Sequence, residues 1–242
     1  LTLNYLRRFK LITFGAANLR LKGQVCKTVC ALGTASFFTQ SALFLLQIVM
    51  NNSLTQYGAQ SVYGEVIPLA CMGIVMKVNQ ILIAFVIGVS IGVQPIIGYN
   101  YGAGNYHRVK EAYFKAVIIA TVITVAGFLA FELIPEKIIN IFGEEDQSYM
   151  TFAVKCFRIY LLMIFTAGYQ IISANFFQAI GKPLRAAALT LTRQVLFLIP
   201  LIRLLGYFFG LEGLLYAGPV ADVVSAVVTF FFISKEIRNL GQ

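Results

Sequence analysis

The sequence predicts an all-α membrane protein that folds as a bundle of six transmembrane helices. Three observations favour this class: 59% of the 242 residues are hydrophobic, only 12% are charged, and the mean hydropathy is +0.80. A water-soluble domain carries about 25% charged residues, roughly twice the fraction found here. The long apolar segments match helices of roughly 20 residues, the length that crosses a hydrocarbon core of about 30 Å. A helix also satisfies its own backbone hydrogen bonds in lipid.

The predicted helices follow the apolar segments in order, separated by loops that contain glycine, proline or charged residues. They comprise residues 28–50, 66–98, 109–133, 151–178, 186–209 and 213–234. Residues 1–27 form a predicted cytoplasmic basic connector, and residues 28–238 form the six-helix domain.

Prolines and glycines predict local features inside these helices. Pro95 and Pro200 each remove a backbone hydrogen bond within a predicted helix, which favours a kink. Gly88 and Gly92 have the GxxxG spacing that allows two helices to approach closely.

The basic residues alternate between loops, and this alternation predicts the topology. The connector, the segments that follow the second and fourth helices, and the C-terminal tail contain 14 of the 19 Lys and Arg residues, counting Arg193. The positive-inside rule places these segments in the cytoplasm, so both ends of the chain are predicted to be cytoplasmic. Because the charge is divided among loops, the net charge of +9 does not indicate binding to nucleic acid.

No catalytic or metal site is predicted. Cys26 and Cys30 lie one helical turn apart, but no second pair or histidine completes a metal site. The sole histidine, His107, lies in a predicted cytoplasmic loop, and the predicted helices contain no Ser/His pair, paired Asp residues or metal cluster. The sequence therefore predicts a protein that is not an enzyme and has no cofactor.

Polar residues inside the predicted helices are candidates for contact with a small molecule. In the first helix Ser36, Gln40, Gln47 and Asn51 share one face, which should point away from lipid. Two interpretations remain equally open: a cavity wall that binds a small molecule, or hydrogen bonds between helices. The candidate substrate-binding residues are Gln40, Gln47, Asn51, Asn79, Gln80, Tyr169 and Asn175.

Asp222 is the one acidic residue deep in a predicted helix, about midway along 213–234. An isolated Asp at this depth costs about 2.5–3.5 kcal/mol, so such a residue usually has a partner. Arg193, in the adjacent antiparallel helix, is the expected partner. We favour a structural ion pair that fastens the two helices over a switch that responds to protons or sodium.

The segment Gly88–Lys110, GVSIGVQPIIGYNYGAGNYHRVK, resembles the second-half signature of the multidrug and toxic compound extrusion (MATE) family. Four further segments fit the same family in the expected order: Phe176–Pro183, Arg193–Pro200, Gly210–Gly213 and Gly218–Asp222. The resemblance covers residues from about 20 to 238 and is closest to the MepA-like bacterial branch of the family.

The resemblance implies twelve helices in two six-helix lobes, of which this chain is similar to the C-terminal lobe. The N-terminal lobe is absent from this chain and is an expected partner, together with the lipid bilayer and small drug-like substrates. The implied function is a secondary active antiporter in the bacterial cytoplasmic (inner) membrane. It exports amphipathic or cationic compounds in exchange for protons or sodium.

The resemblance also bears on the coupling ion. Some members carry a cation-binding Glu in the helix that corresponds to residues 28–50 and an Asp in the helix that corresponds to 151–178. This chain has no carboxylate in either helix. The coupling carboxylates are therefore expected in the absent lobe.

A flippase of related fold, which moves a lipid or a lipid-linked oligosaccharide, is the alternative function. Its anionic head group would need several basic residues facing the cavity. Only Lys77 and Arg193 are candidates within the predicted helices, so the sequence favours multidrug export.

Overall fold

The computed structural model describes residues 23–142 and 147–240, and these residues form helices and turns with no strand among them. The predicted all-α class is thereby confirmed. Residues 1–22 of the predicted connector lie outside the described residues. The chain divides into two compact units, Leu1–Phe37 and Phe38–Gln242. In the first unit the described residues are the beginning of helix α2 (Gly23–Ala59), and all later helices belong to the second unit.

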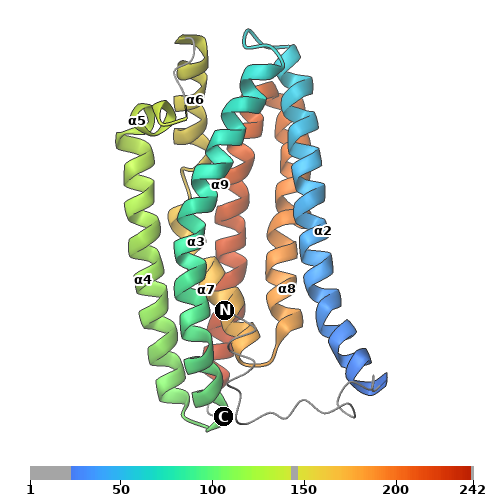
Figure 1. Cartoon of the computed structure of the whole chain (residues 1–242), viewed down its shortest axis with the longest axis vertical. Helices are drawn as coiled ribbons and strands as arrows, with labels where there is room; N and C mark the ends of the chain where they lie inside the picture. Colours follow the sequence, from blue (N-terminus) through green and yellow to red (C-terminus); the bar gives the residue numbers. More distant parts are fainter. Residues whose placement is uncertain (1–22, 143–146, 241–242) are drawn as a thin grey trace, which may run out of the picture. The chain divides into compact units, whose positions relative to one another are not determined.

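The described part of the second unit contains the end of α2 and eight further helical segments, seven α-helices and one π-helix (Figure 1). The segments are α3 (Val66–Gly102), α4 (Tyr106–Leu133), α5 (Pro135–Asn140), α6 (Gln147–Tyr160), α7 (Phe165–Ala179), α8 (Pro183–Leu191), the π-helix η2 (Thr192–Leu198) and finally α9 (Ile199–Asn239). The predicted helices 66–98 and 109–133 correspond to α3 and α4.

The predicted helix 151–178 is two helices in the structure. Residues 161–164 interrupt it, and the axes of α6 and α7 differ by 50°. By length and apolar composition, α3, α4 and the segment Pro183–Asn239 each pass as able to cross a membrane, and the bent α6–α7 pair adds a fourth if it is one span. The helix α2, which contains the predicted helix 28–50, is not in this set.

The segment Pro183–Asn239 contains the last two predicted helices. Its 57 residues would be about 85 Å long as one straight helix, far longer than a bilayer core. Gly210 interrupts it with φ 61° and ψ −138°, a conformation that is open mainly to glycine. Arg193 and Asp222 form an ion pair across this interruption, although a straight helix would place them about 44 Å apart. The chain therefore reverses at Gly210, and the two arms lie side by side.

The helix α7 is central to the second unit, since it packs against α3, α4, α8 and α9. The buried apolar side chains form two clusters at different levels along the helices. The first cluster includes Phe152, Phe157 and Leu214, and the second includes Tyr113 and Phe176. The two clusters form the apolar core on either side of the site described below.

The GxxxG motif does not mediate close packing within the described chain. A Cβ atom placed on Gly88 or Gly92 would meet no atom within 4 Å, and both residues are exposed. The prediction of a close helix approach at this motif is therefore wrong for these residues. The close approach occurs instead at Gly168, where a Cβ atom would lie 2.8 Å from the carbonyl oxygen of Ala120 on α4.

Candidate functional site

A layer of polar residues separates the two apolar clusters. On five helical segments polar residues fall, along the chain, between residues of the first cluster and residues of the second. We define this polar layer as Asn79 (α3), Thr124 (α4), Gln170 (α7), Arg193 and Gln194 (η2), and Asp222 and Ser225 (α9). Burying polar groups among apolar residues is unfavourable unless they are paired, so the contacts within the layer decide what it can do.

The strongest contact in the layer is the ion pair between Arg193 and Asp222. The Arg193 Nε donates to Asp222 Oδ1 at 2.7 Å, and Nη2 lies 2.5 Å from the same oxygen. The Asp222 side chain is 6% exposed and the Arg193 side chain 33%. The carboxylate is therefore inside the protein, and the guanidinium connects it to the surface of η2.

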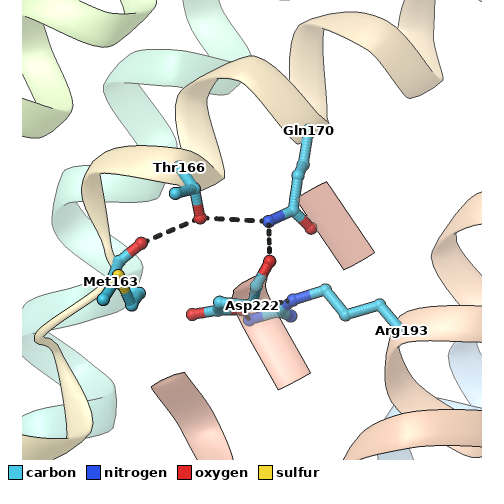
Figure 2. Close-up of polar contacts among 5 residues, drawn as sticks. All are labelled: Met163, Thr166, Gln170, Arg193 and Asp222. Carbon is cyan, nitrogen blue, oxygen red and sulfur yellow. Dashed lines mark hydrogen bonds and ion pairs between the residues drawn. The ribbon is translucent and has the colours of Figure 1, made fainter. Parts of the chain in front are cut away.

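Gln170 connects the ion pair to the interrupted helix (Figure 2). Its Nε2 donates to the backbone oxygen of Asp222 at 3.1 Å and lies 3.1 Å from the Thr166 hydroxyl oxygen. The Thr166 hydroxyl in turn donates to the carbonyl oxygen of Met163 at 2.9 Å, within the interruption between α6 and α7. A continuous chain of hydrogen bonds thus links the interruption to α9.

The backbone is irregular in all three segments that meet here. Residues 161–164 interrupt the α6–α7 pair, and η2 is a π-helix directly before Pro200. Pro219 lies inside α9, one turn before Asp222. The sequence predicted a kink at Pro200, and in the structure the helix widens into a π-helical segment just before this proline. Irregular backbone within a membrane is tolerated where it is buried in protein or lines a cavity, and π-helical turns occur often at functional sites.

The layer also keeps unused hydrogen-bonding capacity. Asn79 Oδ1, Gln194 Oε1 and Ser225 Oγ are buried and have no hydrogen-bond partner within the described residues. Ser225 follows Asp222 by about one turn of α9, and Gln194 follows Arg193. Each unpaired buried group costs about 1–3 kcal/mol of stability. A sequence that retains such groups in one layer is typical of a site that contacts a polar ligand or an ion.

The candidate substrate-binding residues of α2 lie on its surface. Gln40 and Gln47 are exposed and Asn51 is half-buried, while the side chain of Ser36 lies outside the described residues. The Gln47 Nε2 donates to Asn51 Oδ1 at 3.3 Å, so the structure joins these two residues within the helix.

The remaining candidates lie on α3 and α7. Asn79 is half-buried and Gln80 exposed, and both Tyr169 and Asn175 are half-buried. Of these four residues, Asn79 belongs to the polar layer, and Tyr169 precedes Gln170 of the layer on α7. The sequence also missed two contacts. The amide of Gln170 gave no signal that it would reach Asp222, and a buried carboxylate near the chain end, Glu236, accepts hydrogen bonds from two basic residues.

The described residues offer no protein site for a metal ion, since they contain no group of three or more His, Cys, Asp or Glu side chains that could hold one. The polar layer therefore consists of an ion pair, amides and hydroxyls. Such groups can hold a proton, a weakly bound cation or the polar atoms of an organic molecule.

An all-helical bundle with an interrupted helix and a buried polar layer defines a polytopic membrane protein of the transporter class. The chain belongs to the MatE family, which matches residues 35–203. The resemblance to MATE transporters that the sequence indicated is thereby confirmed.

Three proteins illustrate this relationship. The multidrug export protein MepA of Staphylococcus haemolyticus is 23% identical over 96% of this chain and 49% of its own length. A FAD transporter of Shewanella oneidensis is 23% identical over 69% of this chain and 37% of its own length. The solved structure of the MATE multidrug transporter DinF-BH superposes with a TM-score of 0.82 at 32% identity, over 99% of this chain and 53% of that chain. The chain thus spans at most about half the length of these relatives.

Proposed function

We propose that the chain is the C-terminal six-helix lobe of a secondary active multidrug exporter. One observation carries this proposal: in a chain of the MatE family, an interrupted membrane helix meets a buried polar layer, and Gln170 of this helix donates to the backbone oxygen of Asp222. Discontinuous helices near the middle of the membrane are where secondary transporters bind substrates and coupling ions. The second lobe, which would complete the cargo cavity, is the proposed partner.

The proposed orientation places both ends of the chain in the cytoplasm of a bacterium, with the protein in the inner membrane. The basic residues support this orientation, because Arg108, Lys182, Arg185 and Lys235 all lie at one end of the helices, near the second apolar cluster. The opposite end, which would face outward, includes the exposed acidic residue Glu65.

The proposed cargo cavity lies against α2 and α3. Gln40 and Gln47 on α2 and Gln80 on α3 are exposed, and contact with lipid would be unfavourable for a polar amide. A cavity shared with the second lobe would cover these amides and let them bind polar groups of an amphipathic compound. Asn79 of the polar layer directly precedes Gln80 on α3, so this surface adjoins the layer.

The export cycle would alternate access by rocking one lobe against the other, driven by a proton or sodium gradient. Within this lobe, Arg193 and Asp222 fasten η2 to α9. Two guanidinium nitrogens contact Asp222 Oδ1 and balance the charge of the carboxylate, which weakens its attraction for a coupling cation. We therefore assign the coupling carboxylates to the second lobe and a structural role to this pair.

The ion pair also weighs against the flippase alternative. An anionic head group would need free positive charge in the cavity, but the charge of Arg193 is balanced by Asp222. Of the two basic residues that the sequence indicated for binding a head group, Lys77 then remains.

Inverted membrane vesicles that contain the full-length protein test the proposal. Uptake of a fluorescent organic cation is expected under an imposed proton or sodium gradient, and the ion that drives uptake identifies the coupling ion. FAD belongs in the substrate panel because one relative is a FAD transporter. Movement of a labelled lipid without uptake of any organic cation would instead support the flippase.

A further inference from the structure

A cavity of about 490 Å³ lies where α3 and α9 end and where α4 and α8 begin. Its wall includes four charged residues, Lys182, Arg185, Lys235 and Glu236. We propose that this cavity binds the head group of an anionic phospholipid from the adjacent membrane leaflet. The inference depends on the proposed membrane orientation and is independent of the exported compound.

The cavity wall carries net positive charge, because three basic side chains surround one carboxylate. Glu236 is buried, with 7% of its side chain exposed, and it accepts hydrogen bonds from both Lys182 and Arg185. These contacts hold the two cations at the cavity but use few of their donors, since a lysine has three and an arginine five. Lys235 is exposed and forms no ion pair with any residue that the structure describes. A bound anion would therefore meet an unbalanced lysine and the spare donors of two fixed cations.

Four helix ends meet at the cavity mouth. The helices α4 and α8 both begin here, and their N-cap residues, Asn105 and Lys182, make no side-chain capping hydrogen bond. The first N–H groups of a helix carry partial positive charge, which favours an anion at that end. Because α3 and α9 also end here, and a helix C-terminus carries the opposite partial charge, the four helix ends largely cancel, and the positive character of the cavity comes from the three basic side chains.

Aromatic side chains form the apolar part of the wall. Phe231 and Phe232 on α9 are 67% and 45% exposed, and Tyr101 contacts Tyr106 edge to face with ring centroids 5.9 Å apart. Exposed aromatic rings beside basic residues are typical of the membrane–water interface. The ligand should therefore combine a negative head group with an apolar chain. A phospholipid has both parts, whereas a free phosphate ion has no group to contact the phenylalanines.

The proposed orientation places the cavity at the cytoplasmic leaflet. Basic pockets between transmembrane helices on this side bind the head groups of acidic lipids, and basic residues near the surface attract them. The size of the cavity suits a phosphate with its glycerol, and the acyl chains would extend along the exposed phenylalanines.

Native mass spectrometry of the full-length protein with an equal mixture of phosphatidylglycerol and phosphatidylcholine tests the proposal. The wild-type protein is expected to retain phosphatidylglycerol in preference to phosphatidylcholine. Lys235→Gln should lower this preference about tenfold, because it removes a charged donor of the cavity wall, and a hydrogen bond to a charged group contributes about 1.5 kcal/mol or more. Lys235→Arg should preserve it. Arg238→Gln is the matched control, because Arg238 is exposed in the last turn of α9 but does not line the cavity.

Three results would overturn the proposal. The first is equal retention of the two lipids by the wild-type protein, and the second is an equal loss of preference in Lys235→Gln and Arg238→Gln. The third is complete displacement of phosphatidylglycerol by inorganic phosphate, which would identify a site for a soluble anion. Size-exclusion chromatography verifies that each variant remains folded, which is expected because Lys235 and Arg238 are both exposed.

Discussion

Arg193 and Asp222 are 29 positions apart in the sequence, yet the Arg193 Nε lies 2.7 Å from Asp222 Oδ1. The pair joins two arms that the turn at Gly210 brings side by side, and each arm is irregular at this level. The first arm is a π-helix at Arg193, and the second contains Pro219 just before Asp222. The ion pair thus connects the arms at a level where a π-helix and a proline interrupt the regular α-helical hydrogen bonds.

Asp222→Asn is expected to destabilise the folded protein by roughly 3–5 kcal/mol, because it leaves the charge of Arg193 largely buried without a counter-ion. Arg193→Gln should have a similar effect for the converse reason. The double variant should lose less than the sum of the two, since it contains no unpaired charge. Thermal unfolding of the purified protein in detergent measures all three.

Glu212→Gln provides the control for this prediction. Glu212 also pairs with a basic residue, Lys155, but its side chain is 61% exposed, so the loss should stay below about 1 kcal/mol. A stable Asp222→Asn variant that transports cargo without coupling to an ion gradient would contradict the fastening role. That result would make Asp222 part of the ion-coupling machinery.

The sequence predicted the long helices well because their boundaries have strong local causes. The helices α3 and α4 follow from apolar length and from the glycine-rich loop between them. The interruption at residues 161–164 contains neither proline nor glycine, so no local signal marks it. It depends on tertiary contacts, among them the Thr124 hydroxyl of α4, which lies 3.1 Å from the carbonyl oxygen of Phe165.

The same distinction applies to the site. Asp222 was identifiable because a carboxylate inside a membrane helix is costly, and Arg193 because a partner was required. Gln170 is one of several amides in its helix, and the pattern alone did not indicate which amide would reach Asp222. Glu236 lies just beyond the predicted end of the last helix, where acidic residues are ordinary. Its burial results from α9 continuing to Asn239.

Gly168→Ala is expected to destabilise the protein by about 1–3 kcal/mol through overpacking. The added Cβ atom would lie 2.8 Å from the Ala120 carbonyl oxygen and 3.1 Å from Thr124 Oγ1, so α4 and α7 would have to separate. Gly92→Ala is the control, because its Cβ atom meets nothing within 4 Å and alanine favours a helix by up to about 1 kcal/mol. Melting temperatures of the two variants should therefore differ in sign. An equal loss in both would contradict the assignment of the close contact to Gly168.

Glu236→Gln is expected to cost about 1.5–3 kcal/mol, the usual contribution of hydrogen bonds to a charged group. The loss should be smaller than for Asp222→Asn, since Lys182 and Arg185 are 36% and 52% exposed and can regain water. It should also shrink at high salt, which screens partly exposed pairs. Thermal unfolding at low and high ionic strength measures both effects.

Glu111→Gln is the matched control for the Glu236 variant. Glu111 pairs with Lys115 on the same helix, and their side chains are 48% and 69% exposed. Such a pair contributes about 0.3–0.5 kcal/mol. A Glu236→Gln variant no less stable than Glu111→Gln would show that the buried carboxylate does not hold α8 to α9.

Asn79→Leu separates a functional role from a structural role by the sign of two measurements. The buried Oδ1 of Asn79 has no hydrogen-bond partner within the described chain, so its removal should raise the stability of the protein without cargo by about 1–3 kcal/mol. If the amide contacts cargo, as proposed, the same substitution should raise the apparent KM for a fluorescent cation in vesicles. Gln56→Leu, an exposed amide of α2 outside the candidate set, should change neither quantity. A lower melting temperature with unchanged transport would instead indicate that Asn79 bonds another helix in the full-length protein, and the residue would be structural.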